Sequence, residues 1–211
     1  MVARTGARPV ACLGGPAHAA EAVAGRAALV VAASDPVFGA QLERVLREAG
    51  CECEVNDDIV GVQLAGCAKN AAALAAGFAL TGGANDAGAA AARVFAECHL
   101  LARARGADSA SFIGVAGTGD LVATVLSPGS RNRRAGELLG GGMDSGTIER
   151  VVGQAAEALD FTPLLAGAMR RAGIDAPATA ALAEVVEGAR PEEEPCAAAE
   201  GPSSERLIAV A

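Results

Sequence analysis

Two polar residues, Lys69 and Asn70, lie in the middle of an apolar stretch and are the first candidates for chemistry. The stretch reads LAGCAKNAAALAAGFAL and otherwise consists of small and apolar residues. Burial disfavours the charged form of an ammonium group and brings its proton affinity toward the range of a useful acid or base. The alternative is that the aliphatic stem crosses apolar surface while the amine reaches water. The helix alone leaves both interpretations open.

The second candidate is GVAGTGDLVATVLSPGSRNRRAGE, residues 114–137. Asp120 and Thr124 are one helical turn apart, which places a carboxylate and a hydroxyl on the same side of a short helix. Ser130 begins the sequence SRNRR and can cap the helix that follows, so that backbone N–H groups join the guanidinium groups around an anion. A solvated basic loop is the alternative.

Composition limits the classes of protein that can carry these residues. The chain has 211 residues, enough for one medium domain or for one domain and part of another. Hydrophobic residues make up 52% and aromatic residues only 2%, so the packing relies on small side chains and favours helix against helix. The net charge of -8 argues against general nucleic-acid binding, which needs a basic surface. Any anion site must therefore be local.

Cysteine and histidine usage argues against a metal centre. No cysteine belongs to a CxxC pair or lies near a histidine at a zinc-like spacing, and only two histidines are present. We expect the cysteines to be small buried residues in a reducing cytosol. The six cysteines are Cys12, Cys51, Cys53, Cys67, Cys98 and Cys196.

The hydrophobic stretches predict a cytoplasmic protein without a membrane span. The first residues, MVARTGARPVACLGG, contain no apolar region of signal-peptide length. Residues 60–80 are about as long as a membrane span, but a lysine near the centre of a span is costly. A buried helix of a soluble protein is the better interpretation of this segment.

The N-terminal pattern predicts strand, helix, strand. Residues 10–13 read as a strand that breaks at a Gly-Gly-Pro turn, and this turn either lines a ligand or serves as a tight connection. An apolar run at 27–34 is typical of a strand buried on both faces, and a helix with Ser34 as its cap follows. A third strand at 51–58 completes a unit that implies a parallel sheet with an edge that needs covering.

After residue 58 the pattern is helical throughout, which predicts a mostly α fold preceded by a small α/β remnant, a partial Rossmann-like sheet. We therefore expect residues 1–57 to be part of a nucleotide-binding domain, 58–189 a helical substrate-binding and catalytic domain, and 190–211 a disordered acidic tail. The expected helices cover about 59–81, 86–105, 132–140, 155–172 and 177–188.

Several stretches together resemble the NAD(P)-dependent glycerol-3-phosphate dehydrogenase family. They are GGPAHAAEAVAG, VNDDIVGVQLAGCAKNAAALAAG and GVAGTGDLVATVLSPGSRNRRAGELLGGG, followed by VGQAAEAL, in an order and spacing that agree along residues 9–188. The resemblance implies a two-domain enzyme with NAD or NADP as cofactor. Its implied activity is reduction of dihydroxyacetone phosphate to sn-glycerol 3-phosphate, a glycerophospholipid precursor.

The resemblance also implies roles for particular residues. By similarity, Lys69 exchanges the proton on the C2 oxygen of the substrate, next to Asn70. Asp120 and Thr124 would orient the amine and the substrate hydroxyls. A buried amine suits this role because hydride transfer to a carbonyl builds negative charge on oxygen, which a proton donor relieves. The implied substrate contacts are Gly15, Ala17, Ser130, Arg131 and Asn132, and the implied cofactor contacts are Ala19, Arg131 and Glu157.

The chain departs from the family pattern in three places. The family begins with strand, G-x-G-x-x-G, helix and a further lysine, which are absent here, so we expect the C-terminal portion of an enzyme that turns over slowly or not at all by itself. Ala17 stands where Ser, Thr or Asn is usual, which predicts a missing hydrogen bond to substrate. The segment ALDFT, after Glu157, lacks the usual arginine.

A non-catalytic helical module, for binding a phosphate ligand or for dimer contacts, is the alternative function. An in-frame G-x-G-x-x-G segment encoded upstream of Met1 would distinguish the enzyme from the module. We expect a small phosphate compound as the partner, no nucleic acid, no membrane span, and a homodimer as one option for assembly.

Overall fold

The computed structural model describes residues 8–188 and contains two compact units. Within the described part, the first unit consists of residues 8–66 and 102–123, and the second of residues 67–101 and 124–188. The change from strands to helices occurs after Asn56, as the sequence indicates. The assignment of 1–57 and 58–189 to different functions stays a prediction, and the expected tail at 190–211 lies outside the described residues.

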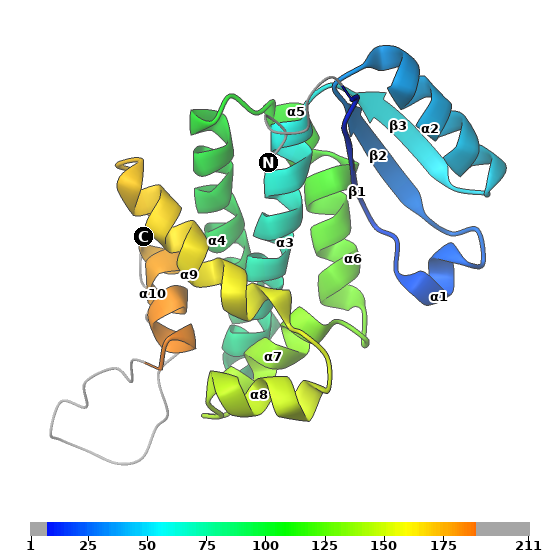
Figure 1. The fold of residues 1–211 in the computed structure, drawn as a ribbon. Helices are drawn as coiled ribbons and strands as arrows, with labels where there is room; N and C mark the ends of the chain where they lie inside the picture. The colour runs from blue at the N-terminus through cyan, green and yellow to red at the C-terminus, as the bar shows by residue number, and fades with distance from the viewer. Residues whose placement is uncertain (1–7, 189–211) are drawn as a thin grey trace, which may run out of the picture. The chain divides into compact units, whose positions relative to one another are not determined.

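A three-stranded sheet forms the centre of the first unit (Figure 1). The strands are β1 (Ala11–Gly14), β2 (Ala28–Ala33) and β3 (Glu52–Asn56), in the spatial order β1-β2-β3. Strands β2 and β3 are parallel, with α2 (Pro36–Glu48) as the crossover between them. The strand–helix–strand pattern of residues 27–58 is therefore confirmed.

The expectation of an all-parallel sheet is wrong for β1, which pairs with β2 in antiparallel fashion. A parallel connection needs a crossover long enough to return to the starting edge, usually through a helix. The segment between β1 and β2 contains only a four-residue helix, α1 (Ala19–Ala22), which is too short for that return. The turn begins at Gly15, where φ is 122°, a conformation that favours glycine.

Both faces of β2 are buried, as its apolar run predicts. Val30 and Ala32 pack against Ile59 and Val62 at the start of α3 (Ile59–Ala79). The alternate residues, Val31 and Ala33, pack on the opposite face, where α2 lies. Because side chains alternate along a strand, one apolar run supplies the two halves of this core.

The start of α2 differs in one detail from the expected cap. Asp35, and not Ser34, is the N-cap, since its side chain accepts a hydrogen bond from the N–H of Phe38 at 2.8 Å. The hydroxyl of Ser34 instead accepts a hydrogen bond from the N–H of Val10 at 3.0 Å. Ser34 therefore ties the chain before β1 to the end of β2.

The expected helices after residue 58 are all present, within a few residues of the expected ends. Four further short elements were not expected as helices: α5, the π-helical turn η3, α8 and the 3₁₀ turn η2. The elements are α3, η2 (Leu80–Gly82), α4 (Ala84–Ala104), α5 (Ser109–Ile113), η3 (Val115–Gly119), α6 (Asp120–Leu126), α7 (Arg131–Gly140), α8 (Ser145–Val152), α9 (Glu157–Arg171) and α10 (Pro177–Val186).

The part of α3 that belongs to the second unit, residues 67–79, is largely buried. Every residue from Ala71 to Ala79 is buried, and a helix that is apolar on all sides belongs in the interior. Two stretches, residues 59–82 and 109–126, are long and apolar enough to span a membrane, with 67% and 33% of their windows buried. The second stretch is interrupted at Gly114, whose backbone is extended with ψ of -153°. The absence of a span stays a prediction.

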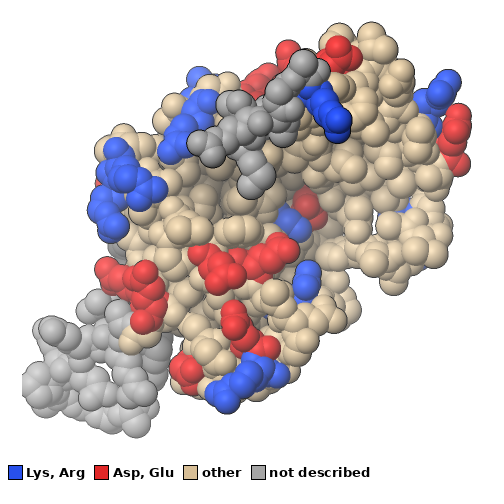
Figure 2. All heavy atoms as spheres, viewed as in Figure 1, with Lys and Arg blue, Asp and Glu red and all other residues tan. Residues whose placement is uncertain are grey.

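Charged side chains of both signs are interspersed on the face seen in Figure 2, and neither sign covers it continuously. The described cysteines are all free thiols. Cys53 and Cys98 are buried, whereas Cys12, Cys51 and Cys67 are half-buried. Among residues 8–188, no group of three or more His, Cys, Asp or Glu side chains could hold a metal ion.

Candidate functional site

Lys69 and Asn70 lie on α3 next to its fully buried half. Lys69 is half-buried, and its Nζ donates a long hydrogen bond of 3.4 Å to Oγ1 of Thr124, the fifth residue of α6. Thr124 is buried, with 3% of its surface exposed. The side chain of Lys69 is therefore partly enclosed, and its amine lies next to the hydroxyl of Thr124.

Asn70 is buried, with 6% of its surface exposed, and its amide is held by Glu157. Nδ2 of Asn70 donates to Oε2 of Glu157, the first residue of α9, at 3.0 Å. The charge of Glu157 also reaches the neighbouring thiol: burial, and to a lesser extent this carboxylate, raise the pKa of Cys67 above its ordinary value. Cys67 and Asn70 are three residues apart, so Glu157 lies over one face of α3.

The SRNRR segment starts α7, and Ser130 is its N-cap, as the sequence predicts. Oγ of Ser130 accepts a hydrogen bond from the N–H of Arg133 at 3.3 Å, and the serine is 5% exposed. Arg131 is exposed, and its Nη1 lies 3.5 Å from Oε1 of Gln154, a marginal hydrogen bond. The sequence did not indicate Gln154, although it lies in the VGQAAEAL stretch.

The three arginines of this segment have different surroundings. Arg133 and Arg134 both form ion pairs with Glu137, one turn further along α7. Within the described part of the chain, Arg131 forms no ion pair with a carboxylate. Arg131 is therefore the arginine of this segment whose whole charge is available to an external anion, because the single carboxylate of Glu137 offsets one of the two charges of Arg133 and Arg134.

Asn132 connects α7 to α9. Its Oδ1 accepts a hydrogen bond from the N–H of Ala158 at 3.1 Å, whereas the N-cap residue of α9, Ala156, makes no side-chain cap of its own. An asparagine from another helix thus satisfies one of the free N–H groups at the start of α9. Within the second unit, the first turn of α9 is held by Asn70 through Glu157 and by Asn132 through Ala158.

The remaining candidates belong to the first unit. Gly15 is buried, and a Cβ there would lie 2.4 Å from the carbonyl oxygen of Ala28, so only glycine fits. Ala17 and Ala19 are exposed. His18 lies between them, and its Nε2 is 3.3 Å from the carbonyl oxygen of Ala123.

Asp120 begins α6 and is buried, with 8% of its surface exposed. The preceding turn, η3, is a π-helical turn closed by the hydrogen bond from the N–H of Gly119 to the carbonyl of Gly114 at 3.1 Å. At Gly117 a Cβ would lie 1.7 Å from the carbonyl oxygen of Phe112, so the second glycine of GVAGTG cannot be replaced by a residue with a side chain unless the backbone moves. Single π turns are often found at functional sites.

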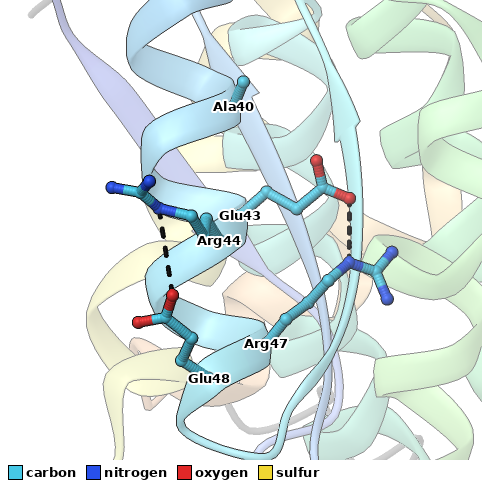
Figure 3. A pocket seen from close by; sticks show the side chains of 5 residues that line it. All are labelled: Ala40, Glu43, Arg44, Arg47 and Glu48. Atoms are coloured by element: carbon cyan, nitrogen blue, oxygen red, sulfur yellow. Dashed lines mark hydrogen bonds and ion pairs between the residues drawn. The ribbon is translucent and has the colours of Figure 1, made fainter.

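One hollow in the first unit lies on the surface of α2 and has no features of a binding site. Figure 3 shows that its lining residues are neighbours on this one helix. Arg44 pairs with Glu48 at 3.9 Å, and Arg47 pairs with Glu43 at 2.9 Å. These pairs have the i, i+4 spacing of a solvated helix surface, where ion pairs contribute little to stability.

Comparison with known proteins finds similarity to a family of NAD(P)-dependent dehydrogenases. Residues 58–196 match the family model described as the C-terminus of NAD-dependent glycerol-3-phosphate dehydrogenase. Glycerol-3-phosphate dehydrogenase [NAD(P)+] of Sodalis glossinidius is 39% identical over 183 residues, which are 84% of this chain and 54% of that protein. The enzyme of the same name from Methylococcus capsulatus is 40% identical over 190 residues, 88% of this chain and 57% of that protein.

The fold agrees with a solved structure from the same family. The crystal structure of glycerol-3-phosphate dehydrogenase from Coxiella burnetii matches with a TM-score of 0.80 and 32% identity, covering 85% of this chain and 56% of that one. The chain belongs to the glycerol-3-phosphate dehydrogenase family. It spans about half the length of the curated relatives that it matches.

Proposed function

We propose that this chain carries residues that bind the substrate and exchange a proton in a glycerol-3-phosphate dehydrogenase [NAD(P)+], which interconverts dihydroxyacetone phosphate and sn-glycerol 3-phosphate. One observation carries the proposal: Lys69 interrupts the apolar helix α3 and lies beside Thr124, in a chain whose residues 58–196 match the family. A lysine on a largely buried helix, hydrogen-bonded to a buried threonine, suits a proton donor better than a side chain extended into water.

Lys69 would act at the C2 oxygen of the substrate. When a carbonyl at C2 is reduced, negative charge builds on its oxygen, and an ammonium group within hydrogen-bond distance stabilises that charge and supplies the proton. Thr124 accepts a hydrogen bond from the ammonium, which limits the rotation of that group. Asp120 and Asn70 are proposed as further catalytic residues, with Asp120 orienting charged and hydroxyl groups.

Arg131 is proposed as the main phosphate ligand, assisted by Ser130 and Asn132. It is exposed and has no ion pair with a carboxylate among residues 8–188, so its guanidinium is available for bidentate contact with a phosphate. Gly15 and Ala17 are proposed as further substrate contacts. At Ala17 the side chain offers no hydrogen bond, which predicts weaker binding than in relatives with a hydroxyl there.

The residues present fit a nicotinamide cofactor in part. Arg131 offers a cation for a phosphate, and the exposed carboxylate of Glu157 can accept hydrogen bonds from hydroxyl groups, while Ala19 leaves room near the glycine turn. NAD or NADP, in its reduced form, would supply the hydride. We further propose that the chain acts in the cytoplasm on this small phosphate compound and binds no nucleic acid.

Calorimetric titration of the purified 211-residue chain tests the proposal. We expect glycerol 3-phosphate to bind, inorganic phosphate to compete with it, and Arg131→Ala to weaken both by about tenfold or more, because charge-assisted hydrogen bonds are lost. The exposed Arg170 on α9 offers the matched control, Arg170→Ala, which should leave both affinities unchanged. Lys69→Ala should retain binding of inorganic phosphate. Absence of binding to the parent chain would contradict the proposal.

A second measurement separates the dehydrogenase from a phosphate-binding module. If the chain belongs to a dehydrogenase site, NADH should raise its affinity for dihydroxyacetone phosphate, and Lys69→Ala should remove any oxidation of NADH by that substrate. Turnover by the chain itself is predicted to be slow, so fast turnover would refute that expectation. If NADH leaves the affinity for the phosphate ligand unchanged, the result favours a phosphate-binding module.

A further inference from the structure

The buried amide of Asn70 is asymmetric, and its orientation decides whether it accepts a hydrogen bond from a ligand or donates one to it. One end of the side chain carries an oxygen that only accepts hydrogen bonds, and the other carries an NH₂ group that only donates them. The two ends have almost the same shape, so a neighbouring group must decide which end points where. In this chain the deciding neighbour is Glu157, because an ionised carboxylate only accepts hydrogen bonds and therefore selects the NH₂ end.

We propose that Glu157 is a positioning residue that acts through Asn70, an inference that rests on the proposed function. The hydrogen bond of 3.0 Å from Nδ2 of Asn70 to Oε2 of Glu157 directs the NH₂ group toward α9. Oδ1 is then presented on the opposite side of the amide, where it can accept a hydrogen bond from a hydroxyl of a polyol phosphate. Among residues 8–188, no hydrogen bond to this Oδ1 is present.

Two further observations support the placement of the Glu157 carboxylate. First, its charge contributes to the raised pKa of Cys67, on the same face of α3 as Asn70, so the carboxylate faces this part of the helix. Second, Glu157 is the first residue of α9, where the N-terminal end of the helix stabilises a negative charge. Oδ1 of Asn132 accepts a hydrogen bond from the N–H of Ala158, the residue after Glu157, and so fixes the turn from which Glu157 projects.

A residue that positions Asn70 behaves differently from a residue that only contacts the cofactor. A residue that touches only the cofactor leaves the binding of glycerol 3-phosphate unchanged when no cofactor is present. A residue that orients Asn70 affects that binding in the cofactor-free chain, because the freed amide turns and presents NH₂ groups to a hydroxyl in part of the population. The two roles therefore make different predictions for one simple titration.

Calorimetric titration of the cofactor-free 211-residue chain with glycerol 3-phosphate is the test. Glu157→Ala should weaken binding by up to about tenfold, because at most one neutral hydrogen bond, from a ligand hydroxyl to Oδ1 of Asn70, is lost. Glu157→Gln retains an acceptor oxygen and should restore binding to within about threefold of the parent. Asp160→Ala is the matched control, because Asp160 is an exposed carboxylate in the same first turn and its side chain makes no hydrogen bond within residues 8–188.

Inorganic phosphate serves as a second probe, since it has no polyol hydroxyls. Its affinity should be unchanged in Glu157→Ala, which would show that the variant is folded and that the loss concerns the hydroxyl-bearing part of the ligand. Equal weakening of both ligands would overturn the inference in favour of general damage. An unchanged affinity for glycerol 3-phosphate in Glu157→Ala would overturn it in favour of a contact with the cofactor alone.

Nuclear magnetic resonance of the ligand-free chain separates failure of this inference from failure of the proposed function. The side-chain NH₂ signals of Asn70, assigned by their loss in Asn70→Asp, should shift in Glu157→Ala and remain in place in Asp160→Ala. If the parent chain binds neither ligand, the proposed function fails, whereas the Asn70 signals still report whether Glu157 holds the amide. Unshifted Asn70 signals would overturn the positioning role whatever the titrations show.

Discussion

The crossing of α3 and α7 allows a substitution whose effect can be worked out from the structure. At Gly77 of α3, an added Cβ would lie 2.0 Å from the carbonyl oxygen of Arg133 and 2.9 Å from the N–H nitrogen of Glu137. At Gly66, on the same helix, an added Cβ would meet no heavy atom within 4 Å. Alanine substitutions at these two positions therefore compare a close helix contact with open space in one element.

The two substitutions should change stability in opposite directions. Alanine is favoured over glycine inside a helix by about 0.5–1 kcal/mol, so Gly66→Ala should stabilise the chain by about that amount. At Gly77, ordinary contact requires about 3.4 Å, so α7 must move by about 1.4 Å, the difference from 2.0 Å. Such overpacking typically costs about 1–3 kcal/mol, which outweighs the gain in helix propensity. We expect Gly77→Ala to be less stable than the parent by about 1–2 kcal/mol.

Urea unfolding followed by circular dichroism gives the free energies of unfolding of the three chains. Because Ser130, Arg131 and Asn132 lie at the start of α7, Gly77→Ala should also weaken binding of inorganic phosphate, whereas Gly66→Ala should leave it unchanged. If Gly77→Ala proves as stable as Gly66→Ala, the close approach of α3 and α7 is wrong, and with it the argument that glycine allows this crossing.

Two further predictions concern carboxylates of the second unit. Glu97 of α4 accepts hydrogen bonds from the N–H groups of Ala178 (2.9 Å) and Thr179 (2.7 Å), at the start of α10, whose own N-cap residue makes no side-chain cap. Glu97→Ala should therefore lower the free energy of unfolding by about 2 kcal/mol, while the exposed Glu184→Ala should change it little; equal effects in urea unfolding would contradict this role. Glu157→Gln removes a negative charge that raises the pKa of Cys67, so that pKa should fall toward, though not to, its ordinary value, since burial still raises it. Alkylation of Cys67 at fixed pH, followed by mass spectrometry, should then be faster in Glu157→Gln than in the parent, and an unchanged rate would remove Glu157 from this face of α3.

Local pattern determined much of the fold and the choice of candidate residues. The longer helices between Ile59 and Val186 follow from apolar periodicity and capping residues, and Ser130 caps α7 as its position before a helical run indicates. Lys69 is conspicuous because an ammonium group interrupts an apolar run. These features can be predicted from the sequence because each depends on residues within one or two helical turns of one another.

The antiparallel pairing of β1, by contrast, could not be read from the order of the elements. The strand pattern is the same for either direction, and the decision depends on whether the connection is long enough to return, which the short α1 is not. The π turn η3 was missed for a similar reason, because its glycines are compatible with any tight turn until the neighbouring carbonyl of Phe112 is in place.

The partners of the candidate residues were decided by tertiary structure alone. Asn70 and Glu157 are 87 positions apart, and Asn132 reaches Ala158 across 26 positions. A hydrogen bond of about 3 Å depends on how whole helices pack, and spacing in the sequence carries no record of that packing. The sequence therefore determined which chemical groups this protein possesses, while the packing of α3, α7 and α9 decided how the Asn70 amide and the first turn of α9 are held.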